Sequence, residues 1–133
     1  MDRVLLCESR DATQRFGRTF RVSCDVGVGD EPDLVLWRGR FRLRNSTFRF
    51  PMSQVERFAL LLRTSMTYGS AGEMEYILGR ETITIRTDGL DPVRLRMRAS
   101  SFGAISWSKI DIPAACADDI LQAFEAESAR FSG

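Results

Sequence analysis

The sequence predicts an α+β fold in which two helices lie on one face of a mostly antiparallel sheet. Three observations predict this class. Strand-like alternation dominates the chain, two segments have helical periodicity, and a proline precedes each of those segments. We expect a two-layer fold with about seven or eight strands. A chain of 133 residues is long enough for one domain, 1–133, with a sizeable core.

Alternation with a period of two predicts strands in both halves of the chain. In the first half these are Arg3–Glu8, Thr19–Val28, Leu34–Arg44 and a short strand that ends in Phe48-Arg49-Phe50-Pro51. In the second half they are Glu73–Leu78, Thr82–Thr87, Pro92–Ala99 and Ala104–Ile112. Gly29-Asp30-Glu31-Pro32 is expected to be a turn.

Two segments have apolar residues at helical spacing and are predicted to be helices, Met52–Thr64 and Ala114–Ser128. Pro51 and Pro113 precede them, and these prolines are 62 positions apart. Because the residues around both prolines match at this offset, we expect two pseudo-repeats, about 1–66 and 73–131, with a linker at 67–72.

The strand before each predicted helix changes the parity of its apolar residues. Phe41 and Leu43 occupy odd positions and Phe48 and Phe50 even ones, and Ile105, Trp107, Ile110 and Ile112 repeat this change. A parity change requires a bulge or a break, so we expect one in both halves. Trp107 lies at the change, and as a large aromatic residue it is expected in the core.

Arginines recur at every second position in two of the predicted strands, which places them on the side opposite the apolar core face. With one arginine from the strand between, they form the candidate binding face: Arg38, Arg40, Arg42, Arg44, Arg86, Arg94, Arg96 and Arg98. The acids expected on this face are fewer, chiefly Asp25, Glu73 and Glu75. Arginine suits bidentate recognition of carboxylates and phosphates.

Three interpretations of the arginine face stay open. In the first, the face binds an acidic protein or a second subunit, which leaves homodimerisation open. In the second, the face binds single-stranded nucleic acid. A net charge of only +1 disfavours such binding, and exposed aromatic residues would favour it. In the third, the face is a solvated, salt-bridged sheet surface of a structural or oligomerisation module. Lys109 is the only lysine among 19 basic residues, and an arginine-rich coding bias explains such a ratio.

The composition argues against several classes of function. Without histidine, the chain lacks Ser-His-Asp and Cys-His catalysis, and no motif for a metal or another cofactor is present. We therefore expect a protein that is not an enzyme. Cys7, Cys24 and Cys116 are expected to be reduced and buried. We expect no transmembrane helix and no signal peptide, and hence a cytoplasmic location.

The strand ending in Phe-Arg-Phe-Pro, the helix with Phe58, Ala59 and Leu62, and the Glu73–Arg98 meander together resemble small bacterial proteins of the WapI type. This resemblance implies an immunity protein that neutralises a toxin. The predicted order of strands and then a helix, twice, is more distantly similar to Pur-type repeats, which implies single-stranded nucleic-acid binding across the sheets. Our leading expectation is a non-enzymatic bacterial binding protein that uses the arginine face, and the resemblance implies the immunity type.

Overall fold

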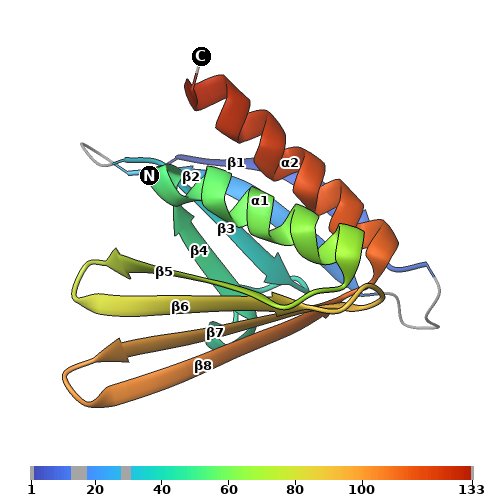
Figure 1. Cartoon of the computed structure of the whole chain (residues 1–133). Helices are drawn as coiled ribbons and strands as arrows, with labels where there is room; N and C mark the ends of the chain where they lie inside the picture. Colours follow the sequence, from blue (N-terminus) through green and yellow to red (C-terminus); the bar gives the residue numbers. More distant parts are fainter. Residues whose placement is uncertain (1, 13–17, 28–30, 133) are drawn as a thin grey trace.

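The computed structural model describes residues 2–12, 18–27 and 31–132 and confirms an α+β chain with eight strands and two helices (Figure 1). The first half comprises β1 (Asp2–Arg10), β2 (Thr19–Val26), β3 (Asp33–Arg38), a short 3-10 helix η1 (Arg44–Ser46), β4 (Thr47–Pro51) and α1 (Met52–Tyr68). The second comprises β5 (Gly72–Leu78), β6 (Glu81–Asp88), β7 (Val93–Ser101), β8 (Ala104–Ile112) and α2 (Ala114–Ser132). The predicted strand end at Val28 and the turn residues Gly29 and Asp30 lie outside the described residues.

The strands form two antiparallel sheets of four strands, so the expectation of one continuous sheet is wrong. Sheet A has the order β1-β2-β3-β4, and sheet B has the order β5-β6-β7-β8. Within each sheet, every strand pairs with its neighbour in sequence. Alternation along a strand shows which side is apolar but not which strand lies alongside, and for this reason the sequence did not distinguish one sheet from two.

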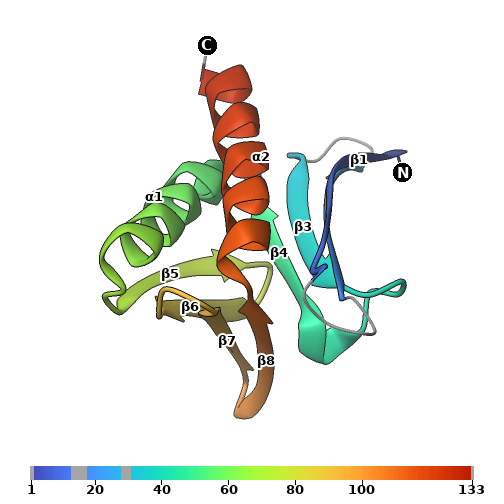
Figure 2. The ribbon, with the colours of Figure 1, turned by 90° about the vertical axis from the view of Figure 1, so that its right-hand side faces the viewer.

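Each helix lies against strands of the other half of the chain. α1 follows sheet A but contacts β5 and β6 of sheet B, in addition to β3 and β4. α2 follows sheet B and contacts β1 and β2 of sheet A. The helices also contact each other, as Figure 2 shows, and Arg63 on α1 pairs with Glu125 on α2 at 2.5 Å. Four strands and a helix occur twice, and the structural equivalence of the two halves stays a prediction.

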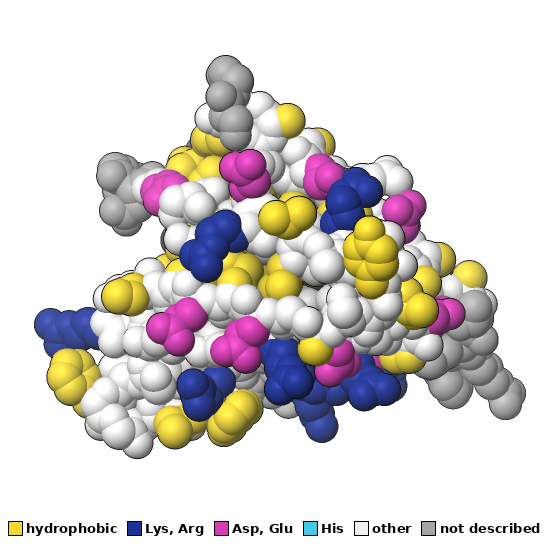
Figure 3. All heavy atoms as spheres, viewed as in Figure 1, with side chains coloured by type: hydrophobic (Ala, Val, Ile, Leu, Met, Phe, Trp, Pro, Cys, Tyr) yellow, Lys and Arg dark blue, Asp and Glu magenta, His cyan; other side chains and the backbone are white. Residues whose placement is uncertain are grey.

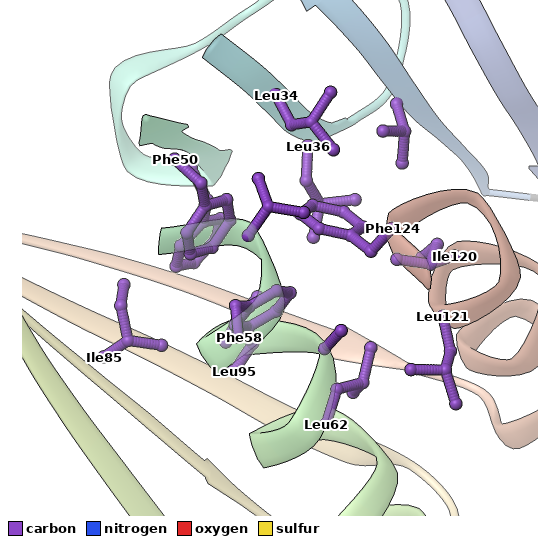
Figure 4. Close-up of a cluster of buried hydrophobic side chains, with 14 of the residues drawn as sticks. Leu34, Leu36, Phe50, Phe58, Leu62, Ile85, Leu95, Ile120, Leu121 and Phe124 are labelled. Carbon is purple, nitrogen blue, oxygen red and sulfur yellow. The ribbon is translucent and has the colours of Figure 1, made fainter. Parts of the chain in front are cut away.

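A single cluster of buried apolar side chains joins both sheets and both helices (Figure 4). Its centre is aromatic. Phe50 of β4 stacks on Phe58 of α1 with ring centroids 4.2 Å apart, and Phe124 of α2 meets these rings edge-on at 5.5 and 5.0 Å. Large apolar side chains buried in this way contribute about 1.5–3 kcal/mol each to stability.

Loop carboxylates accept hydrogen bonds from the first turns of both helices. Glu31 accepts from the backbone N–H of Ser53 at 2.7 Å, and Asp91 accepts from that of Ala114 at 3.1 Å. The first turn of a helix has unpaired N–H groups and a partial positive charge, which a carboxylate satisfies. α1 ends at Gly69, which adopts the left-handed conformation (φ 69°) and whose N–H bonds to the Ser65 carbonyl.

Candidate functional site

The eight predicted arginines do not form one face, because β3 ends at Arg38 and not at Arg44. The chain turns at Gly39, whose φ of 94° is a conformation that glycine adopts without strain. Arg40, Arg42 and Arg44 therefore lie in the connection from β3 to β4, which we call the 38–46 segment. Their alternation is not that of a strand, and the prediction of the strand Leu34–Arg44 is wrong beyond Arg38.

Arg42 is a structural residue and not part of an open cationic face. Its guanidinium binds both carboxylate oxygens of Asp25, at 2.5 and 3.0 Å, and also donates to Ser23 Oγ. The same group lies 4.4 Å from the ring centroid of Trp37. Arg42 thus fastens the 38–46 segment over the outer face of sheet A, where Asp25 is only 3% exposed.

The Asp25 carboxylate also lies 3.5 Å from both Arg3 and Arg49. Burial alone would raise the pKa of Asp25. The hydrogen bonds from Arg42 and Ser23, with the charges of Arg42 and Arg3, outweigh that effect, so the pKa lies below its ordinary value. Asp25, which we expected on the arginine face, therefore serves as the anchor of the 38–46 segment.

The 38–46 segment continues past the edge of sheet B. Ser108 Oγ on β8 donates to the Arg44 carbonyl at 2.8 Å, so η1 lies against this edge strand. Arg44 lines a groove of about 470 Å³ between the 38–46 segment and the inner face of sheet B, the face that carries the core. Covering an edge strand in this way limits its pairing with other chains.

The outer face of sheet B, opposite the core, carries the remaining arginines in register. One row across the four strands reads Glu73, Arg86, Arg96, Lys109, and the next reads Glu75, Thr84, Arg98, Trp107. In these two rows the acids occupy β5 and the cations occupy β6, β7 and β8, whereas a third row, Asp88, Arg94, Asp111, has acids on β6 and β8. We call Arg38, Arg86, Arg96, Arg98 and Lys109 the cationic band. Arg38 joins the others because it lines one cavity together with Arg96 and Lys109.

Counter-ions on this face are few. Arg96 pairs with Asp111 at 2.9 Å, and Arg94 lies 3.8 Å from Asp88. Arg38, Arg86, Arg98 and Lys109 form no ion pair with any residue that the structure describes. Figure 3 shows dark-blue Lys and Arg side chains gathered along the lower part of the molecule, where Figure 1 places sheet B, below a pair of acidic side chains. The charges are thus separated in the rows of Arg86 and Arg98 and mixed in the row of Arg94.

Trp107 lies on the outer face and not in the core, so the core prediction for this residue is wrong. It is 66% exposed and sits directly across from Arg98 in the β7–β8 register. β8 keeps a regular register with no bulge, and its even-numbered residues all point inward. Ile105 and Trp107 are therefore outward, and with Ile77 on β5 they add exposed apolar surface beside the cationic band.

Neither helix in the described part of the chain has the length and apolar composition of a bilayer-crossing segment. The described residues also contain no group of His, Cys, Asp or Glu side chains that could hold a metal ion. Cys7, Cys24 and Cys116 are free, and burial raises the pKa of the Cys7 and Cys24 thiols. No family model matches the chain, and no curated protein matches it.

The structure thus keeps five predicted arginines on or beside the outer face of sheet B, namely Arg38, Arg86, Arg94, Arg96 and Arg98. The other three lie elsewhere. Arg42 binds Asp25, Arg44 lines the groove on the inner face of sheet B, and Arg40 is exposed in the connection from β3 to β4. Sequence reasoning missed Lys109 and Trp107. The signal that could have placed them on the outer face is the alternation of Trp107, Lys109 and Asp111 with Ser108 and Ile110.

Proposed function

We propose that this chain is a non-enzymatic binding protein that docks an acidic protein through the cationic band. The observation that carries the proposal is the pairing of unneutralised cations with an exposed Trp107 on one open sheet face. Arg98 and Trp107 are direct cross-strand neighbours, and Arg86 and Lys109 flank Arg96 in the adjacent row. Arginine and tryptophan are the residues most enriched in binding hot spots.

The apolar residues beside the cationic band favour a protein partner. Ile77 is 74% exposed and Ile105 is 56% exposed, and both belong to the row next to Arg98 and Trp107. Protein interfaces combine an apolar centre with charged groups that steer the approach of the partner. The resemblance to WapI-type immunity proteins suggests that this partner is a bacterial toxin, met in the cytoplasm of the cell that makes both proteins.

Self-association through the same face is the competing arrangement. In a two-fold pairing of sheet B with its copy, about an axis parallel to the strands, β6 faces β7 of the other copy and β5 faces β8. Arg86 then meets Arg96, which is a like-charge pair, but Glu73 meets Lys109 and Asp88 meets Arg94, which are pairs of opposite charge. Charge alone therefore does not separate a homodimer from a docked acidic partner, and sedimentation of the purified protein distinguishes the two.

Charge reversal tests the proposal. Arg86→Glu with Arg98→Glu changes two exposed side chains without touching the Asp25 contact, so the variant should lose no more than about 1 kcal/mol of stability, from the like charge placed opposite Glu73. We expect it to lose at least 90% of the partner that the wild-type protein captures from extracts of its own cells, including the product of any adjacent toxin gene. Arg10→Glu, an exposed change on β1, is the matched control and keeps capture. Equal capture by the double variant and the control refutes docking through the cationic band.

Exposure of Trp107 supports a second candidate, single-stranded nucleic-acid binding, because bases stack on such side chains. This hypothesis predicts retention of mixed single-stranded oligonucleotides on a filter at low salt, with a steep loss as salt rises. Trp107→Ala should weaken binding by about 1–3 kcal/mol. No retention at micromolar protein excludes this candidate and leaves the protein-docking proposal unaffected.

A further inference from the structure

A small cavity lies where the 38–46 segment meets the outer face of sheet B. Its volume is about 130 Å³, and it is lined by Arg38, Asn45, Arg96, Lys109 and Asp111. Arg38 and Asn45 come from the first half of the chain, and the other three residues come from β7 and β8. The cavity therefore exists only because the two halves fold together.

Arg96 is held in a fixed position at this cavity. Its Nη1 forms an ion pair with Asp111 at 2.9 Å and donates to the Leu95 carbonyl at 3.0 Å and to the Ile110 carbonyl at 3.4 Å. Its Nε and Nη2 atoms donate no hydrogen bond within the part of the chain that the structure describes. A guanidinium fixed by one nitrogen, with others unused, is a pre-organised donor for an oxyanion.

The other two cations of the cavity have no counter-ion among the described residues. Arg38 is half-buried at the end of β3, and Lys109 is the cross-strand neighbour of Arg96. The lining thus carries three cations against the single carboxylate of Asp111, and that carboxylate is already paired. Like charges gathered around one cavity repel one another, and a bound anion would relieve this repulsion. The Asn45 amide adds an uncharged donor.

We propose that this cavity binds one oxyanion of the phosphate type, a tetrahedral dianion. The excess of two positive charges matches a dianion better than a carboxylate. The volume holds about four water molecules at ~30 Å³ each, which is room for one phosphate group but not for a nucleotide. The site goes beyond docking of an acidic protein and does not depend on the identity of that protein. Free phosphate and a phosphate carried by a larger molecule share this chemistry.

Inorganic phosphate is the first probe, with the melting temperature as the readout. If the dissociation constant is about 1 mM, 10 mM phosphate multiplies the folded-to-unfolded ratio by about 11 and raises Tm by roughly 5 °C. Phosphate also stabilises folded proteins by exclusion from their surface. The informative quantity is therefore the shift relative to chloride at equal ionic strength, compared between the wild-type protein and variants.

Arg38→Gln with Lys109→Gln should abolish the specific shift, and Arg10→Gln should keep it. Lys109→Gln alone, at an exposed position, keeps the test valid if the double variant does not fold, and it should weaken phosphate binding at least fivefold by calorimetry. A wild-type shift no larger than that of the double variant overturns the proposal. An acetate shift as large as the phosphate shift overturns the assignment to a dianion.

Two further experiments complete the test. One distinguishes free phosphate from phosphate carried by a larger molecule, and the other distinguishes the oxyanion site from the docking surface. Phosphoserine and a short oligonucleotide with a 5′-terminal phosphate both carry a phosphate monoester, and each competes with inorganic phosphate for the same calorimetric signal, which distinguishes a carried phosphate from a free one. Trp107→Ala changes an uncharged side chain of the docking surface outside the cavity lining and should leave phosphate binding within twofold. Loss of partner capture with intact phosphate binding in that variant therefore separates the docking surface from the oxyanion site.

Discussion

Replacing Asp25 with asparagine removes the charge that fastens the 38–46 segment to sheet A. The carboxylate accepts two hydrogen bonds from Arg42, at 2.5 and 3.0 Å, and one from Ser23 at 2.9 Å. Removing one member of a buried ion pair costs about 3–5 kcal/mol. The Arg42 side chain is 15% exposed and can turn partly toward water, so we expect about 3 kcal/mol, the lower end of that range.

Urea denaturation at pH 7 measures this loss, and Tm should fall by roughly 10 °C for a chain of this length. Asp111→Asn is the matched control, because it removes another Asp–Arg pair at 2.9 Å whose side chains are 49% and 38% exposed. The control should cost no more than about 1 kcal/mol. If Asp25→Asn costs no more than Asp111→Asn, burial does not set the strength of the Asp25 pair and the reasoning fails.

The pH dependence gives an independent check. The folded-state pKa of Asp25 lies below its unfolded value, so the carboxylate adds stability above the unfolded pKa of about 3.9. That contribution is lost as the pH falls through the folded-state pKa. The stability difference between the wild-type protein and Asp25→Asn should therefore shrink as the pH is lowered below about 4. A difference that stays constant from pH 7 down through this range contradicts the assignment.

Three other substitutions test the core, a helix end and the outer face. Phe124→Ala, at the centre of the aromatic cluster, should cost about 3–5 kcal/mol in urea denaturation. Asp91→Ala removes the carboxylate that accepts from the Ala114 N–H and should cost about 1 kcal/mol, measured in the same way, with no change in the folded circular dichroism spectrum. Trp107→Phe should change stability by less than about 0.5 kcal/mol and leave a protein whose fluorescence, from buried Trp37, resists acrylamide quenching.

Local signals in the sequence located the helix starts and the strand before the second helix. The prediction placed the helices from Met52 and Ala114, and the structure begins them at the same residues. The strand Ala104–Ile112 also has its predicted bounds. Proline position and strand alternation act over a few residues, and that is the range over which a single sequence is informative.

The arginine alternation from Arg38 to Arg44 misled the prediction because it crosses a turn. Gly39 takes a backbone conformation with φ of 94°, and the chain leaves the sheet there. What decides the path beyond it is Asp25, distant in sequence, which binds Arg42. A contact of that kind leaves no periodic trace in the sequence, so alternation alone could not reveal it.

Trp107 was misplaced because the inner side of β8 is partly polar. Ser106 and Ser108 point inward, where apolar residues were expected, and the apolar Ile105 and Trp107 then suggested a change of face. Ser108 is tolerated inside because its hydroxyl donates to the Arg44 carbonyl of η1. The same 38–46 segment therefore accounts for both errors.

This segment also connects stability with binding, because it brings Arg38 and Asn45 to the oxyanion cavity and Arg42 to Asp25. Asp25 does not line the cavity. If the contact between Arg42 and Asp25 holds the segment in place, Asp25→Asn should weaken phosphate binding at least threefold at 15 °C, where the variant stays folded. Calorimetry on the folded variant measures this, and Asp111→Asn, which removes a lining acid, should not weaken binding to the same extent. Undiminished affinity in Asp25→Asn would mean that the contact between Ser108 and Arg44 alone positions the segment.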